Sequence, residues 1–138
     1  MIRFGKDIAP GAELHRKLAL LAWCQVANCI AGVDTGGRCA LRDGGSFTLT
    51  TGILAREPIR TGAASSLANG ALEAFVMAAA VELPRGIRIN AVSATVLAEA
   101  PSYHESFRGF TQAPAATVAQ AYVKSVEGVQ TGCVFKIG

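Results

Sequence analysis

The chain has 138 residues, which suits one domain and leaves too little for two of ordinary size. Its residues are 51% hydrophobic and only 17% charged, which excludes an intrinsically disordered protein. The net charge is +3, and the 13 basic residues are spread along the sequence rather than clustered. Because nucleic-acid binding needs a concentrated basic surface, we expect a globular protein with no nucleic-acid partner.

The first 45 residues show no sharp element boundaries, and we treat them as a separate, poorly matched N-terminal segment. Their composition predicts one helix at about residues 12–32. The apolar run at 18–33 is shorter than the roughly 20 residues that a membrane span needs, and it contains Gln25 and Asn28. Asp7 and Glu13 disfavour a signal peptide, the alternative interpretation. We therefore expect a buried helix and no membrane association.

Elements become clear after Gly45. A β-branched and aromatic run predicts a strand at 46–51, and a polar loop follows at 58–62. Residues 63–83 are rich in alanine and leucine and predict a long helix that Pro84 and Gly86 end. Two adjacent stripes of mostly small apolar residues predict a helix between a sheet and another helix. The first stripe comprises Ala71, Phe75, Ala79 and Leu83, and the second comprises Ala64, Ala68 and Leu72.

A second strand is predicted at 87–93, where apolar and polar residues alternate, and a looser aromatic segment follows at 94–113. Pro114 predicts the start of a second helix and Gly128 its end. A last strand is predicted at 132–137. The expected inward stripe of the second helix comprises Val118, Ala121, Tyr122 and Val126. Strands alternating with helices of this length predict an α/β fold, in which parallel strands are joined by right-handed crossovers.

The residues of this half resemble a known family. The run LPRGIRINAVS at 83–93 is similar to the "elxxxgIrvNaVsPG" stretch of short-chain dehydrogenases/reductases, and GSFTLTT at 45–51 resembles the strand that ends in their catalytic serine. Residues 46–138 are thus similar to the C-terminal part of that family, more narrowly to short members with Thr-Thr-Gly and Ala-Asn-Gly-Ala. The resemblance implies a partial Rossmann-like, doubly wound parallel sheet in three α/β/α layers, with the N-terminal βα units missing.

The family's chemistry uses a tyrosine as proton donor, a lysine four residues later and a serine at the preceding strand end. The resemblance puts Ser65 in the tyrosine position, Asn69 in the lysine position and Thr51 in the serine position. Ser65 is a far weaker acid than tyrosine, and Asn69 carries no charge to activate it. The alternative interpretation of both residues is a polar first turn of a helix. The resemblance therefore implies an oxidoreductase with degenerate catalytic residues.

The family also implies NADP or NAD as cofactor and a small carbonyl or alcohol as substrate. The candidate cofactor-binding residues are Thr50, Asn69, Thr95, Val96 and Leu97. Ala94 and Thr95 replace the family's Pro-Gly, and residues 1–45 lack its TGxxxGxG turn, which holds the pyrophosphate. Tyr103 is a candidate replacement for the proton donor; otherwise it is an aromatic residue in a surface loop.

Metal binding is not expected. The cysteines are Cys24, Cys29, Cys39 and Cys133. They form no CxxC pair, and His15 and His104 are distant from them in sequence. Free thiols are typical of the cytoplasm, where we expect the protein to be.

The sequence leaves three further hypotheses open. The first is that the gene is truncated, with a frameshifted or replaced N-terminal segment. Alternatively, the chain is a non-catalytic scaffold that forms homo-oligomers through its long helix, whose Ala64, Ala68 and Ala71 permit close contact. A third hypothesis is an unstable fragment whose exposed strand edge promotes association.

Overall fold

A computed structural model describes residues 41–138 of the chain. The helix expected at 12–32 and three of the four cysteines lie outside the described residues. The elements are β1 (Ser46–Gly52), the 3-10 helix η2 (Ile53–Ala55), α3 (Ala63–Glu82), β2 (Arg88–Ala94), α4 (Pro101–His104), α5 (Ala115–Glu127) and β3 (Val134–Ile137). The three predicted strands and both long helices are confirmed, with shifts of two residues or fewer at their ends.

The strands form one parallel sheet in the order β1-β2-β3. Thr51 is in register with Ser93, and Ala94 with Ile137, so the strands end at the same edge. The residues of β2 from 89 to 93 are all buried, although the sequence alternates. The reason is that β2 is the central strand of a parallel sheet and has helices over both faces.

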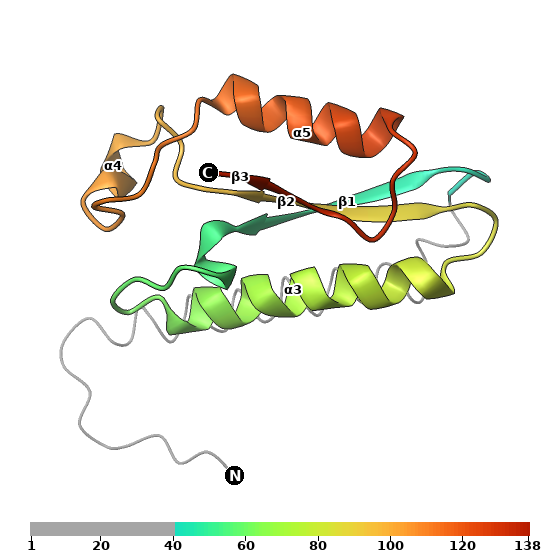
Figure 1. The fold of residues 1–138 in the computed structure, drawn as a ribbon, viewed down its shortest axis with the longest axis horizontal. Coiled ribbons are helices and arrows are strands. Elements are labelled where there is room, and N and C mark those ends of the chain that lie inside the picture. Colours follow the sequence, from blue (N-terminus) through green and yellow to red (C-terminus); the bar gives the residue numbers. More distant parts are fainter. Residues whose placement is uncertain (1–40) are drawn as a thin grey trace, which may run out of the picture.

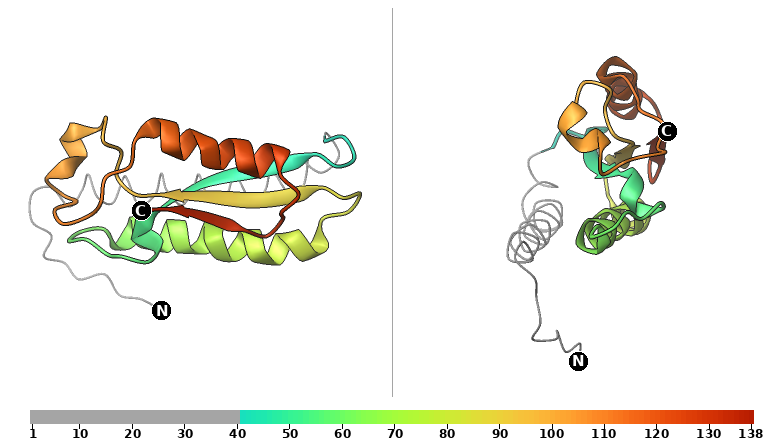
Figure 2. Two further views of the ribbon diagram at one scale, coloured as in Figure 1. Left: turned by 45° about the horizontal axis from the view of Figure 1, so that its top comes forward. Right: turned by 90° about the vertical axis from the view of Figure 1, so that its left-hand side faces the viewer.

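The helices lie on opposite faces of the sheet, with α3 on one side and α5 on the other (Figure 1). Figure 2 shows the same three layers end-on. Because both crossovers move across the sheet in the same direction but over opposite faces, they have opposite hands. The expectation that both are right-handed is therefore wrong for one of them, which belongs to the rare left-handed class.

The inner face of α3 is made by Leu72, Val76 and Ala79, which are buried against the sheet. Both predicted stripes omit Val76, although it is fully buried, because they follow the more numerous alanines. Ala68 and Ala71 pack against this core from its margin. By length and composition alone α3 is apolar enough to cross a membrane, while its three buried residues pack against the sheet.

The inner face of α5 also differs from the predicted stripe. Ala121 and Ser125 are buried, whereas Val126 is 51% exposed. A serine is stable at this position because Ser125 Oγ lies 2.7 Å from Thr48 Oγ1, on β1. One turn earlier on α5, the hydroxyl of Tyr122 lies 2.7 Å from Thr50 Oγ1. Two hydroxyl pairs thus fix α5 on the first strand.

The C-terminal end of α5 is held by a side chain from the sheet. Arg88, the first residue of β2, donates from its guanidinium to the carbonyl oxygens of Ser125, Val126 and Gly128. These carbonyls have no partner within the helix and carry the negative end of its dipole, so a cation stabilises them. The arginine of the GIRIN run is therefore a capping residue for α5.

Candidate functional site

A cleft of about 660 Å³ opens at the C-terminal edge of the sheet. Its walls come from the ends of β1 and β2, from η2, from the first half of α3 and from the α4 segment. Eight of the residues around it are the candidate site residues of the sequence: Thr50, Thr51, Ser65, Asn69, Thr95, Val96, Leu97 and Tyr103. The fold therefore brings all of them to one place.

The position of the cleft follows from the topology. The C-terminal ends of neighbouring parallel strands leave a crevice, and the connecting loops form its walls. Gly52, at the end of β1, lies within contact distance of both α3 and the end of β2. A Cβ atom at Gly52 would lie 3.4 Å from Asn69 Nδ2 and 3.5 Å from the carbonyl oxygen of Ala94.

Ser65 and Asn69 lie one turn apart near the N-terminal end of α3, Ser65 exposed and Asn69 half-buried. Both face the cleft, but neither brings a charge or a titratable proton to it. Among the residues that line the cleft, Tyr103 alone has a titratable side chain, and it is 61% exposed. The cleft is thus lined by hydroxyls, one carboxamide and apolar surface.

Several backbone groups of the 95–97 segment are already hydrogen-bonded. The Thr95 amide donates to the Ile137 carbonyl at 2.8 Å, which ties β2 to β3. The Val96 carbonyl accepts from the Ala113 amide at 3.0 Å, and the Leu97 carbonyl lies 2.9 Å from His104 Nε2. The Thr95 hydroxyl is different, because it is buried and has no hydrogen-bond partner among the described residues. It is therefore the polar atom of this segment that is most in need of a partner.

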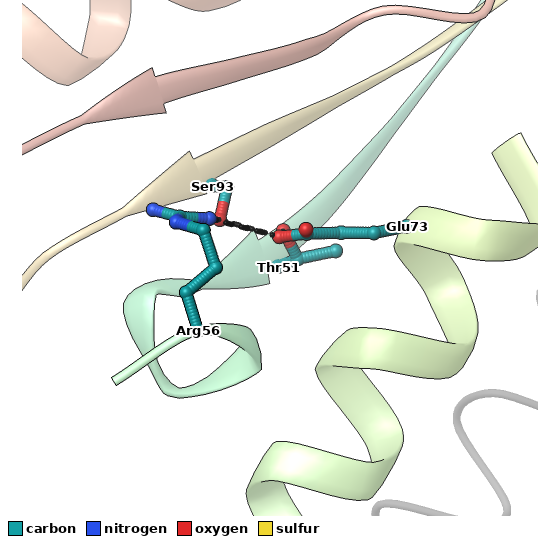
Figure 3. A network of polar contacts seen from close by, with 4 residues as sticks. All are labelled: Thr51, Arg56, Glu73 and Ser93. Atoms are coloured by element: carbon teal, nitrogen blue, oxygen red, sulfur yellow. Dashed lines mark hydrogen bonds and ion pairs between the residues drawn. The ribbon is translucent and has the colours of Figure 1, made fainter. Parts of the chain in front are cut away.

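A polar network lies behind Thr51 and was not predicted from the sequence (Figure 3). Glu73 Oε1 accepts from Thr51 Oγ1 at 3.1 Å, from Ser93 Oγ at 2.6 Å and from Arg56 Nη1 at 3.2 Å. Arg56 Nη1 also donates to Ser93 Oγ at 2.7 Å. The side chains of Arg56 and Glu73 are 24% and 14% exposed, so the pair is largely screened from water.

One sequence signal could have pointed to this network. Glu73 is the sole charged residue within α3 before its last residue, in a helix made otherwise of small and apolar side chains. A carboxylate in such a helix needs a partner. The partner is Arg56, which no spacing rule connects to Glu73 because it lies in the loop after η2.

Within residues 41–138 no three side chains of histidine, cysteine, aspartate or glutamate lie close enough together to hold a metal ion.

Comparison of the sequence with models of known protein families gave no match, and neither did comparison with curated proteins. Solved structures do match. The chain is 49% identical to the protein lin1944 from Listeria innocua, with a TM-score of 0.73, over 81% of this chain and 54% of that one. It is 30% identical to a small-chain dehydrogenase, with a TM-score of 0.63, over 72% of this chain and 50% of that one.

A third match shares the fold at lower identity. It is a small-chain dehydrogenase in complex with NADPH, 23% identical, with a TM-score of 0.72 over 96% of this chain and 65% of that one. The chain therefore spans between half and two thirds of the length of these neighbours. The matches establish the fold as the Rossmann-like parallel sheet of short-chain dehydrogenases, of which the described residues form a part.

Proposed function

We propose that the chain is a short-chain dehydrogenase/reductase-like oxidoreductase with degenerate catalytic residues, whose cleft receives NADP or NAD and a small carbonyl or alcohol. The observation that carries the proposal is the convergence of all eight candidate residues on one cleft. The 49% and 30% identities to the two solved neighbours support common descent. Clefts at the carboxyl edge of such sheets are where dinucleotides bind.

The residues of the cleft fit the nicotinamide end of such a cofactor. Thr50 and Asn69 offer polar side chains, and the segment from Thr95 to Leu97 offers the buried, unpartnered Thr95 hydroxyl. When bound, the cofactor supplies a hydride donor or acceptor. Residues 41–138 contain no glycine-rich strand-to-helix turn for the pyrophosphate. We therefore expect this part of the chain to hold the dinucleotide weakly.

Proton transfer is the weak step of the proposed reaction. Ser65 occupies the donor position without a suitable acidity, and Asn69 adds no charge. Tyr103 lines the same cleft and is the candidate replacement, since its phenol can give up or take a proton. We expect low activity that depends on Tyr103 more than on Ser65.

The experiment is a titration of the purified chain with NADPH and with NADH, followed by nicotinamide fluorescence and by thermal shift. Saturable binding of either cofactor is the expected result. Asn69→Leu should weaken it, whereas Glu82→Gln, an exposed change at the end of the same helix, should not. No change in either signal at millimolar cofactor would reject the proposal for this chain.

A second candidate function is a non-catalytic module that assembles through α3. The outer face of this helix exposes Leu67 (57%), Met77 (56%) and Val81 (88%). The other positions on this face are alanine or glycine, and none of them is charged. A helix face exposed to water normally carries charged residues. The face differs from the one expected from the sequence, because Ala68 and Ala71 pack against the core instead. The partner that we propose for this face is a second copy of this chain.

The oligomeric state tests this alternative. Light scattering after size exclusion should give a dimer or larger species for the wild type. Leu67→Glu with Val81→Glu should shift it to a monomer, whereas Val129→Glu, at an equally exposed valine away from α3, should not. A monodisperse wild-type monomer would contradict both this alternative and the expected association through the edge of β1 that pairs with no other described strand. The cytoplasmic location remains a prediction.

A further inference from the structure

The Thr51 hydroxyl occupies a decisive position at the wall of the cleft. It stands at the end of β1, is 6% exposed, and lines the cleft together with Asn69 and Thr95. A hydroxyl has one hydrogen to donate and two lone pairs that accept. Whether the Thr51 hydroxyl donates to a ligand or accepts from it depends on the group to which it donates its hydrogen.

The hydrogen of Thr51 goes to Glu73, away from any ligand in the cleft. Glu73 Oε1 lies 3.1 Å from Thr51 Oγ1, and an ionised carboxylate can only accept. Ser93 Oγ is engaged with the same two partners, because it accepts from Arg56 and donates its own hydrogen to the same Glu73 oxygen. Thr51, Ser93 and Arg56 therefore each donate a hydrogen to Glu73 Oε1, and Arg56 donates a second one to Ser93 (Figure 3).

Arg56 makes this arrangement persistent. Its guanidinium contacts both Glu73 Oε1 and Ser93 Oγ, and all three side chains are largely or fully buried. Turning the Thr51 hydrogen toward the cleft would leave a buried carboxylate with one donor fewer, which is unfavourable in a screened site.

We infer that Glu73 is a positioning residue that holds Thr51 as a hydrogen-bond acceptor, so that the cleft selects a ligand hydroxyl over a carbonyl at this position. The inference deepens the proposed function and rests on it only in taking the cleft as the substrate site. The serine in the resembling family is expected to hydrogen-bond a substrate oxygen of either kind. In this chain the network leaves Thr51 able only to accept a hydrogen bond in the cleft, which favours an alcohol ligand over a ketone.

An alcohol and the ketone with the same carbon ring test the inference. Cyclohexanol and cyclohexanone are titrated into the ¹⁵N-labelled full chain without cofactor, and amide shifts of residues around the cleft report binding. The alcohol should bind about tenfold more tightly than the ketone, because the ketone leaves an acceptor facing an acceptor. Equal affinities, a tighter ketone, or no saturable shift with either probe would overturn the inference.

Variants separate positioning from packing. Glu73→Met removes the acceptor and frees the Thr51 hydrogen, so the preference for the alcohol should disappear or reverse. Thr51→Val removes the hydroxyl itself and should bring the affinity ratio close to one; it serves if Glu73→Met does not fold. Glu82→Met, on the exposed end of the same helix, should keep the wild-type ratio. If both Thr51→Val and Glu73→Met kept the preference for the alcohol, the positioning role of Glu73 would be rejected.

The outcome is distinguishable from that of the proposed function. Failure of NADPH and NADH to bind, with selective alcohol binding intact, rejects the dehydrogenase and leaves the role of Glu73 standing. Cofactor binding without selectivity for the alcohol rejects the role of Glu73 and leaves the proposed dehydrogenase function standing.

Discussion

Asn90 on β2 accepts a hydrogen bond at its Oδ1 from the backbone amide of Cys133, 43 residues later and 3.0 Å away. Its Nδ2 donates to the carbonyl oxygen of Gln130 at 2.9 Å. The side chain is fully buried, so a single carboxamide fixes the approach of the chain to β3. This explains physically why the GIRIN run carries an asparagine in the middle of a buried strand.

Replacing Asn90 with leucine should lower the free energy of unfolding by about 2 kcal/mol, because both hydrogen bonds of its fully buried carboxamide are lost. Urea denaturation followed by circular dichroism measures the change. The control is Gln112→Leu in an exposed loop, which should stay within about 0.5 kcal/mol of the wild type. An Asn90→Leu variant as stable as this control would contradict the assigned role.

Arg88→Met should destabilise the protein by about 2 kcal/mol, since three carbonyls at the end of α5 lose a charged donor. Arg88→Lys should recover only part of this, because an ammonium lacks the fork that reaches several carbonyls at once. Arg60→Met, in an exposed loop, is the control. Urea denaturation measures the stability of all three variants. If Arg88→Lys were as stable as the wild type, the forked shape of the guanidinium would not matter for capping α5.

Val76→Ala should cost about 2 kcal/mol of stability through the cavity it leaves, because Val76 is fully buried between α3 and the sheet. The matched control is Val81→Ala in the same helix, where the side chain is 88% exposed and the change should be near zero. Thermal unfolding of the two variants gives the comparison. Equal losses would mean that the buried face of α3 is not the one described.

The hydroxyl pair between Thr48 and Ser125 should show energetic coupling. Thr48→Val and Ser125→Ala each leave one hydroxyl without its partner, whereas the double variant removes both groups. A double-mutant cycle in urea should therefore give a coupling of about 1 kcal/mol. Thr48→Val combined with Gln112→Ala should be additive, and additivity in the Thr48–Ser125 cycle as well would refute the contact.

The position of the candidate site residues, but not their chemistry, could be predicted from the sequence. The alignment on a resembling family placed Thr51, Ser65 and Asn69, and the fold gathers them at one cleft with Tyr103. Their chemistry did not follow from that alignment alone. Whether Thr51 donates or accepts depends on Glu73 and Arg56, two residues that the motifs do not mark and that meet only through the tertiary fold.

The sequence by itself determined the order and type of the elements, because glycine, proline and apolar periodicity act within a few residues of one another. It also determined that the cleft carries no tyrosine-lysine pair one helical turn apart, since residue identity decides that. The tertiary structure alone decided which helix faces are buried, that the two crossovers have opposite hands, and where the hydrogen of Thr51 points. These features depend on contacts between residues 20 to 80 positions apart, such as Thr51 with Glu73 and Thr48 with Ser125, and no local pattern encodes them.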